Sequence, residues 1–399
     1  MKEIMRITLP TTFEKSYADS IAEINSKRDM EDNQIAEFYG SMQTSVLGSA
    51  RPSKYLPTLS YIELKKHIEY IESLGIDFSY LANAPCLGNI EYSGNGRLEI
   101  ESFLSRLSDA GVKRMIITIP YLMEIVREKF PHIKIAASSI CYISNLKIAK
   151  RFEELGIERI VIDPDKNRDF KTLKKICSSV SAEIEVIANH TCIHHCSYEY
   201  YHYNNTGHGS QKFNGEAEKP YNQYNLLACT LKKLESPWEF LASPWIRPED
   251  TDFLADAGVK WIKIAGRGSS PEALLELAGA YVKKAYKGNL IPFLGWCHWN
   301  SFRKTEEGNT LPSLEIKLDP SKLNGFMDKF RNGYCCDDGC DTCDYCKKTA
   351  LEAITYDSEL IKLYGAELAS RIAKITKSVF ATYAHYNQEE RIPKLKVIK

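Results

Sequence analysis

The sequence lacks any run of 18 apolar residues, and its opening residues, MKEIMRITLP, contain no apolar leader core. It also lacks a charge excess, since 52 Lys and Arg balance 52 Asp and Glu. A membrane-spanning helix needs about 20 apolar residues, so we expect a cytoplasmic protein with no membrane partner. Without a basic excess a broad RNA-binding surface is disfavoured, and RNA would have to bind a local face. Internal repeats and low-complexity tracts are absent as well.

Cysteine, in contrast, is abundant, with 12 in 399 residues. In a reducing compartment clustered cysteines serve more often as metal ligands than as disulfide partners. We therefore expect the clustered cysteines of this chain to bind metal.

Strand-like and helix-like segments alternate along most of the chain, which indicates a parallel α/β fold. Amphipathic helical stretches such as SYIELKKHIEYIESLG separate the strands, and Ser60 with Glu63 forms the pattern of a capping box at the start of this one. The expected fold is a (β/α)8 TIM-like barrel. The eight predicted strands are 6–9, 35–42, 78–83, 114–119, 134–139, 159–162, 183–188 and 261–265.

We expect the barrel to occupy residues 1–290, with an insertion at about 190–258 after the seventh strand. Within the insertion, SPWEFLASPWIRPED predicts a short strand followed by a helix that begins near Pro248. Residues 291–399 are predicted to form a cysteine-rich extension with amphipathic C-terminal helices. This extension is expected to fold over the C-terminal mouth of the barrel, and its tail to pack on the barrel or on a partner subunit.

The segment YCCDDGCDTCDYCKK carries the strongest chemical signal in the chain. Its cysteines are separated by only a few residues, so consecutive thiolates can converge on one metal centre. Zinc ribbons usually divide their ligands between two separated knuckles, and this compact block therefore favours an iron–sulfur cluster over zinc. A radical S-adenosylmethionine motif is a weaker alternative, since such motifs follow an early barrel strand, whereas this segment lies after the predicted barrel. The predicted ligands are Cys335, Cys336, Cys340, Cys343 and Cys346.

A second group of cysteines follows the seventh strand, where (β/α)8 barrels place their chemistry. Cys192 and Cys196 lie in a loop that is rich in histidine and tyrosine, and Cys229 follows in the insertion. Three thiolates leave one coordination position open. The spare cysteine of the C-terminal block, Cys86 or Cys141 could fill it, and Cys229 could alternatively be a buried apolar residue.

Histidines beside these cysteines offer proton transfer or further metal ligation. We predict His202, Asn204 and His208 as catalytic residues, against the alternative that they only cap loop backbone groups. Mixed cysteine and histidine zinc sites are common, so His190, His194 and His195 could instead join the cysteines around zinc. A cysteine hydrolase with Cys192 as nucleophile is a further alternative.

Basic residues near the last barrel strand are candidate anion ligands. Arg247, Lys263 and Arg267 would bind a carboxylate or phosphate if they share one cavity, because guanidinium groups bind such anions in two-point fashion. A salt bridge that braces the barrel end is the alternative for Arg267. A non-catalytic zinc-binding scaffold would not need to gather these cations.

Several segments, taken in order, resemble the collagenase-like peptidases, the unclassified peptidases of family 32. They are ITLPTTFEKSYADSIAEI, LANAP, RMIITIPYLMEIVREKF, KIAASSI, EIEVIANHTC and LASPWIRPEDTDFLADAGVKWIKIAGR. The resemblance covers about residues 5–290. It implies that Asn83 ends the third strand as in the family, and we assign this residue to substrate binding.

The iron–sulfur members of this family hold a 4Fe-4S cluster with four cysteines and serve oxygen-independent hydroxylation in ubiquinone synthesis or RNA modification. The resemblance matches Cys192 to the cysteine that ends the family's seventh strand, and Cys196 and Cys229 to the next two. This sequence departs from the pattern in three places. A fourth cysteine near SPWIRPED is missing, DPD replaces an arginine–glutamate pair after the sixth strand, and IHH replaces a glycine-rich spacer.

These features together predict an oxidoreductase-like enzyme that depends on one 4Fe-4S cluster or two, with zinc as the alternative metal. Its reaction would modify a small molecule, a peptide or an RNA base without molecular oxygen. Neutral overall charge favours a small-molecule or peptide substrate over RNA. A cysteine or metal-dependent peptidase is the alternative function, and a zinc-binding scaffold the second alternative. The sequence leaves the oligomeric state open.

Overall fold

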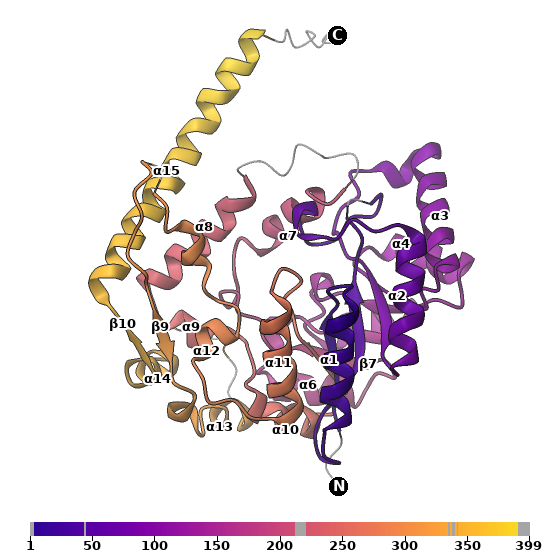
Figure 1. Ribbon diagram of the computed structural model, residues 1–399, viewed down its shortest axis with the longest axis horizontal. Coiled ribbons are helices and arrows are strands. Elements are labelled where there is room, and N and C mark those ends of the chain that lie inside the picture. The colour runs from indigo at the N-terminus through magenta and orange to yellow at the C-terminus, as the bar shows by residue number, and fades with distance from the viewer. Residues whose placement is uncertain are drawn as a thin grey trace.

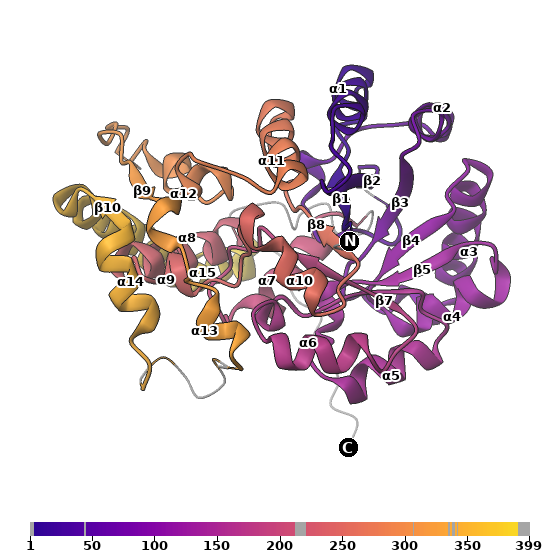
Figure 2. The ribbon, with the colours of Figure 1, turned by 90° about the horizontal axis from the view of Figure 1, so that it is seen from below.

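The computed structural model shows eight parallel strands that close into a barrel in chain order, with β1 paired to both β2 and β8 (Figure 1 and Figure 2). The predicted (β/α)8 barrel is therefore confirmed. The structure describes residues 4–43, 45–211, 221–305, 307–333, 336, 340 and 342–389, without the side chains of 54, 221–223 and 378–389. The barrel strands are β1 (Arg6–Pro10), β2 (Gln34–Gly40), β3 (Asp77–Ala82), β4 (Arg114–Ile117), β5 (Lys134–Ala137), β6 (Arg159–Val161), β7 (Glu183–Ile187) and β8 (Trp261–Lys263).

Helices cover the outside of the barrel and bury their apolar faces against the strands (Figure 2). The predicted capping box is present at the start of α2, where the Ser60 hydroxyl accepts from the Glu63 amide and the Glu63 carboxylate accepts from the Ser60 amide. Gly75 follows α2 with a φ of +75°, a conformation that favours glycine. The barrel helices are α1 (Lys15–Ser26), α2 (Tyr61–Ser73), α3 (Gly94–Asp109), α4 (Pro120–Lys129), α5 (Leu146–Glu154), α6 (Phe170–Cys177), α10 (Thr251–Asp256) and α11 (Pro271–Lys283).

The barrel interior contains a buried ionic network as well as apolar side chains. Glu37 of β2 accepts two hydrogen bonds from the Arg159 guanidinium, at 3.0 and 2.9 Å, and a further one from Arg114. Burial by itself would raise the pKa of Glu37, but the charges of Arg159 and Arg114 outweigh burial and lower it. The network joins β2, β4 and β6 across the barrel and so fixes the frame that carries the loops at its mouth.

The segment between β7 and β8 contains α7 (Glu199–His208), α8 (Tyr221–Glu235) and α9 (Glu239–Ala242). The short strand predicted in SPWEFLASPW is wrong, because α9 lies there instead. The hydroxyl and amide of Ser243 both donate to the Glu239 carbonyl and close a helical turn, and the Trp245 indole donates to the Phe240 carbonyl. Local hydrogen bonding thus outweighs the strand preference of the aromatic residues. The expected helical start at Pro248 is present as a short 3-10 turn that leads into α10.

The extension forms α12 (Leu290–Phe293), β9 (Ile316–Leu318), α13 (Asp328–Arg331), α14 (Tyr345–Ala353), β10 (Ile354–Tyr356) and α15 (Ser358–Glu389). β9 and β10 pair as an antiparallel two-stranded sheet. The long helix α15 lies against α8 of the insertion, and the hydroxyl of Tyr364 anchors it by donating to the Pro312 carbonyl at 2.7 Å (Figure 1). The predicted tail helix therefore packs on the insertion within its own chain.

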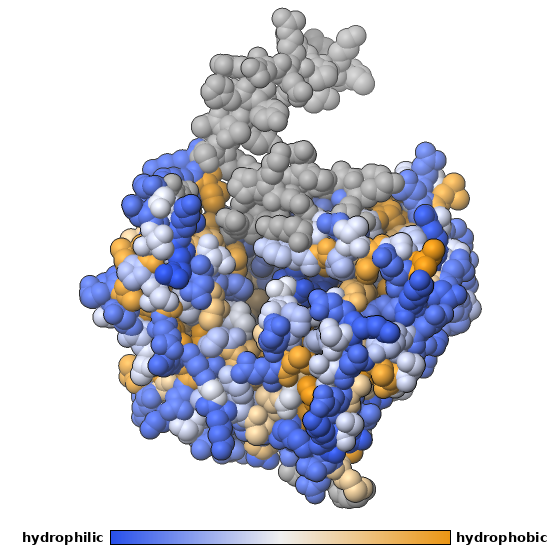
Figure 3. Space-filling view, in the orientation of Figure 1, coloured by the Kyte–Doolittle hydropathy of each residue, from blue (hydrophilic) through white to orange (hydrophobic). Residues whose placement is uncertain are grey.

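On the face shown in Figure 3, hydrophilic residues predominate and hydrophobic residues form small scattered groups. Within the described part of the chain, no helix combines the length and the apolar character that crossing a membrane would require.

Candidate active site at the barrel mouth

The loop that follows β7 is fixed to the end of β8 at its root. The Asn189 side chain donates to the Ala265 carbonyl at 2.8 Å and accepts from the Ala265 amide at 2.7 Å. At the far end of α7, the Ser210 hydroxyl donates to the Ser49 carbonyl and the Gly209 carbonyl accepts from Ser53. The segment 189–211 therefore runs from the β7 side of the barrel mouth to the loop after β2.

Cys192, Cys196 and Cys229 gather around the buried ammonium group of Lys233. This ammonium donates to the Thr191 carbonyl at 2.8 Å and to the Ser243 hydroxyl. Burial lowers the pKa of Lys233 to about 8, while the three thiols act in the opposite direction. Burial raises the pKa of Cys229 to about 12, and it also raises the pKa values of Cys192 and Cys196. The structure thus brings the three predicted ligands together beside one cation.

The spacing of these sulfurs bears on which group they could hold. Among the described residues, the only three metal-ligating atoms of His, Cys, Asp or Glu that lie within 4.8 Å of one another belong to Asp165, His194 and His195. With Zn–S bonds of about 2.3 Å, sulfurs on one tetrahedral zinc ion lie about 3.8 Å apart. In an iron–sulfur cube each thiolate binds a different iron, so the sulfurs lie farther apart. The sulfurs of Cys192, Cys196 and Cys229 therefore do not all lie as close together as one zinc ion would require.

A second set of thiols comes from the extension and consists of Cys336, Cys340, Cys343 and Cys346; Cys335 lies outside the described residues. Burial raises the pKa of Cys346 to about 12, and the other three thiols add to this rise, while the Arg168 guanidinium opposes it. Arg168 is itself buried and donates to the carbonyls of Trp245 and Leu241, both at 2.7 Å. The Arg168 guanidinium thus lies beside the second set of thiols, and the Lys233 ammonium lies beside the first set.

Thiols of the second set lie beside two loops at one end of the barrel. One cavity is lined by Asp165 of the loop after β6, by His194 of the loop after β7, and by Cys336, Cys340 and Cys346. These barrel loops follow the carboxyl ends of their strands, which is where (β/α)8 enzymes place their chemistry. The extension therefore covers part of the C-terminal mouth of the barrel, as expected from the sequence.

Two arginines form a cationic corner at the mouth. Arg267 donates to the hydroxyls of Ser49, at 3.1 Å, and Ser41, at 3.4 Å. Burial lowers the pKa of Arg267 to about 9, and the like charge of Arg51 adds to this effect. The buried Nε of Arg51 has no hydrogen-bond partner among the described residues. Two neighbouring guanidinium groups, one of them with an unused Nε donor, are a suitable site for a carboxylate or phosphate.

Histidines from two separate segments adjoin this corner. Burial, with a smaller contribution from the charge of Arg51, lowers the pKa of His202 to about 4. His298 of the extension behaves in the same way, with its pKa lowered to about 4 by burial and by the charges of Arg51, Lys233 and His202. Both imidazoles are neutral and only weakly basic at neutral pH, so each offers one hydrogen-bond donor and one acceptor. His298 was missed in the sequence, and the segment WCHWN that contains it gave no metal or catalytic spacing.

Other predicted site residues make contacts within the protein. Asn204 donates to the Tyr200 carbonyl at 3.0 Å within α7, and the buried Nε2 of His208 has no partner among the described residues. Arg247 donates to Asp250 at 2.7 and 3.0 Å and to the Pro320 carbonyl at 3.1 Å, which ties the barrel to the extension. Lys263 lies inside the barrel, 3.9 Å from the centre of the Tyr39 ring. The Asn83 oxygen accepts from the Ala50 amide at 3.1 Å.

The proposed sources of a fourth ligand differ in their surroundings. The Cys141 thiol is buried and donates to the Thr118 carbonyl, while Cys86 accepts from the Gly88 amide. The Glu199 carboxyl, which sequence analysis had not selected, faces Cys192 and Cys196. Burial raises the pKa of Glu199 to about 8, and the neighbouring Asp165 and Asp163 contribute. Glu199 has no spacing relation to the cysteines that would have identified it.

The profile of peptidase family U32 matches residues 49–289, so the chain belongs to this family. The matched span includes the first set of thiols and the cationic corner, while the thiols of the extension lie outside it.

Two similar proteins illustrate this relationship. The chain is 25% identical over 308 residues to the uncharacterized protease MJ1657 of Methanocaldococcus jannaschii, with 77% of this chain and 86% of the relative covered. The solved structure of the U32 peptidase Mk0906 is 19% identical, with a TM-score of 0.49 and coverage of 68% of this chain and 96% of that one.

Proposed function

We propose that this chain is an iron–sulfur-dependent enzyme that modifies an anionic small molecule or peptide at the barrel mouth, without molecular oxygen. The observation that carries the proposal is the position of Tyr203 on α7. Burial raises the pKa of this hydroxyl well above its usual value, Cys192 and Glu199 add to the rise, and Arg51 opposes it. Tyr203 also acts on Arg267. Tyr203 thus lies within electrostatic range of both the first set of thiols and the cationic corner.

The donor set supports an iron–sulfur cluster at Cys192, Cys196 and Cys229. Their sulfurs are spaced more widely than one zinc ion requires, and Lys233 offsets the negative charge that three thiolates would introduce. Glu199 is a candidate for the fourth position, since a fourth cysteine is missing. Cys336, Cys340, Cys343 and Cys346 would hold a second cluster beside Arg168. A bound cluster of this kind supplies one-electron transfer.

The side chains of the protein would perform the remaining tasks. Arg51 and Arg267 would bind the carboxylate or phosphate of the substrate and fix its orientation. His202 and His298, both neutral, would orient the substrate through hydrogen bonds, and the Tyr203 hydroxyl would remain protonated and donate a hydrogen bond. The segment 189–211 and the extension would limit the access of water to this corner.

A cysteine peptidase is the second candidate, because the family and both similar proteins carry the name of peptidases or proteases. Cys192 is the candidate nucleophile. The raised pKa of its thiol disfavours the thiolate, and the His194 ring donates to the Asp165 carbonyl at 3.3 Å instead of contacting this cysteine. Both observations count against Cys192 as a thiol nucleophile.

The deciding experiment measures iron and acid-labile sulfide per chain after anaerobic purification. We expect both, in amounts that distinguish one cluster from two. Serine at Cys192 should remove the first cluster, serine at Cys343 should remove the second, and Cys177→Ser on the outer helix α6 is the matched control. Stoichiometric zinc without sulfide would contradict the proposal. Peptide cleavage by metal-free protein, blocked by thiol alkylation at Cys192, would replace it with the peptidase function.

A further inference from the structure

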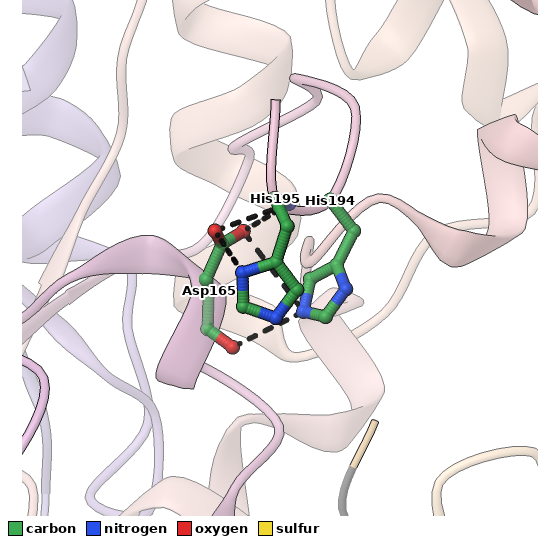
Figure 4. A group of neighbouring side chains, drawn as sticks. All are labelled: Asp165, His194 and His195. Carbon is green, nitrogen blue, oxygen red and sulfur yellow. Dashed lines mark hydrogen bonds and ion pairs between the residues drawn. The ribbon is translucent and has the colours of Figure 1, made fainter. Parts of the chain in front are cut away.

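Asp165, His194 and His195 converge beside the cavity that the extension closes. The Nδ1 atom of His195 lies 3.0 Å from one carboxylate oxygen of Asp165, and Nε2 of His194 lies 3.9 Å from the other. One ligand atom from each residue lies within 4.8 Å of the other two. Figure 4 shows both imidazole rings turned toward the same aspartate. Two imidazoles and one carboxylate therefore share a single small volume.

The backbone holds these three side chains in place. The His195 amide donates to both carboxylate oxygens of Asp165, at 3.2 and 3.1 Å, and the His194 ring donates to the Asp165 main-chain carbonyl at 3.3 Å (Figure 4). His195 has a φ of +53°, a left-handed conformation that is uncommon outside glycine. Such strain persists only where surrounding contacts impose it, and it often marks a functional site. The strained turn directs two adjacent histidines toward one carboxylate.

The site is accessible to solvent on the side of His195. The Asp165 and His194 side chains are largely buried, at 13% and 14% exposure, whereas His195 is 51% exposed. Asp165 and His194 also line the cavity shared with Cys336, Cys340 and Cys346. A fourth ligand can therefore come from water or from a substrate.

We propose that Asp165, His194 and His195 bind one divalent transition-metal ion of the zinc type, and that on binding the His194 ring gives up its hydrogen bond to the Asp165 carbonyl so that an unprotonated nitrogen can coordinate the ion. Two imidazole nitrogens select zinc and its first-row neighbours over magnesium and calcium, which prefer all-oxygen shells. Three protein ligands with one open position are the arrangement of catalytic zinc sites. The donors of this site, two histidines and one carboxylate, differ from the thiolates proposed for the clusters.

The test is a titration of the full-length, anaerobically purified protein with Zn²⁺ after dialysis against a chelator, followed by competition with a chromophoric chelator. The variants are Asp165→Asn and His195→Asn, since asparagine tolerates the left-handed backbone of His195. His132→Gln is the matched control, because His132 is an exposed histidine whose ring contacts Ser108 and Phe130 and is remote from the site in sequence. Circular dichroism verifies that each variant is folded, and sulfide is measured in parallel.

Wild type and His132→Gln should bind one more equivalent of zinc than either site variant, with sulfide content unchanged. The loss of affinity at this site should exceed the roughly 10–100-fold that removal of an outer-shell partner costs. Co²⁺ in place of Zn²⁺ should give visible absorption bands that the site variants lack. Equal zinc stoichiometry and affinity in wild type and folded variants would overturn the proposal and leave the aspartate as a brace for the loop. Loss of sulfide from wild type as well as from the variants would contradict the proposed clusters. It would not contradict the proposed ion site.

Discussion

The ammonium group of Lys233 donates a hydrogen bond of 2.8 Å to the main-chain carbonyl of Thr191, the residue before Cys192. A buried cation on α8 thus holds the loop that carries two of the three clustered thiols. It is surrounded by oxygen acceptors, which compensate part of the cost of removing its charge from water.

Replacing Lys233 with methionine should loosen this loop. The change removes the hydrogen bonds that the ammonium donates to the Thr191 carbonyl and the Ser243 hydroxyl, and we expect a loss of about 1–3 kcal/mol in the free energy of unfolding. Iron content should fall as well, because the thiolates lose their compensating charge. Denaturant unfolding and iron analysis measure both effects. Lys232→Met, at the exposed neighbouring position, is the control and should stay within about 0.5 kcal/mol of wild type. An unfolding midpoint shared by the Lys233 variant and wild type would show that the ammonium does not anchor the loop.

Replacing Arg267 with glutamine should weaken anion binding at the barrel mouth. Charge-assisted hydrogen bonds contribute about 1.5–3 kcal/mol, so we expect roughly 10- to 100-fold weaker binding of inorganic phosphate. Isothermal titration calorimetry with phosphate measures this directly. Arg106→Gln, at an exposed position of α3, should bind like wild type. Unchanged phosphate affinity in the Arg267 variant would limit this residue to its hydrogen bonds with Ser41 and Ser49.

Protonation of His67 should destabilise the protein in mild acid. Burial lowers the pKa of His67 from its ordinary 6.5 to about 4. Between these values the unfolded chain takes up a proton that the folded chain does not, so stability is fully present above pH 6.5 and falls as the pH decreases toward 4. His67→Gln preserves a partner for the Thr11 hydroxyl and should reduce this slope, by at most about 1.4 kcal/mol per pH unit.

Unfolding curves between pH 4 and pH 7.5 measure this slope. His132→Gln, at an exposed position, should retain the wild-type dependence. A His67 variant with the wild-type slope would place the acid sensitivity in other groups.

The barrel could be predicted because residues that are close in sequence determine each strand and helix. Ser60 and Glu63 lie in one helical turn, and Gly75 closes the same helix, so neighbouring residues suffice to place α2. The SPWEFLASPW segment shows the limit of such reasoning. Its helical turn depends on the hydrogen bond that the Ser243 hydroxyl donates to the Glu239 carbonyl.

The site was only partly predictable for a related reason. The cysteines have a recognisable spacing, whereas Lys233, Glu199 and Asp165 acquire their roles from neighbours on other elements. Arg51 and Arg267 are separated by most of the barrel sequence, and no local pattern connects them. Their proximity follows from closure of the barrel, which brings the loop after β2 next to the end of β8.

The two walls of the cavity beside His194 are synthesised at different times. Its barrel side is made from Asp165 and His194, while its other wall, with Cys336, Cys340 and Cys346, is translated much later. Because chains fold from the N-terminus as they emerge from the ribosome, the barrel loops stand open until the extension has been made. In the finished chain the same loops share a wall with the extension, so the cavity acquires its final lining only after this extension has folded onto the barrel.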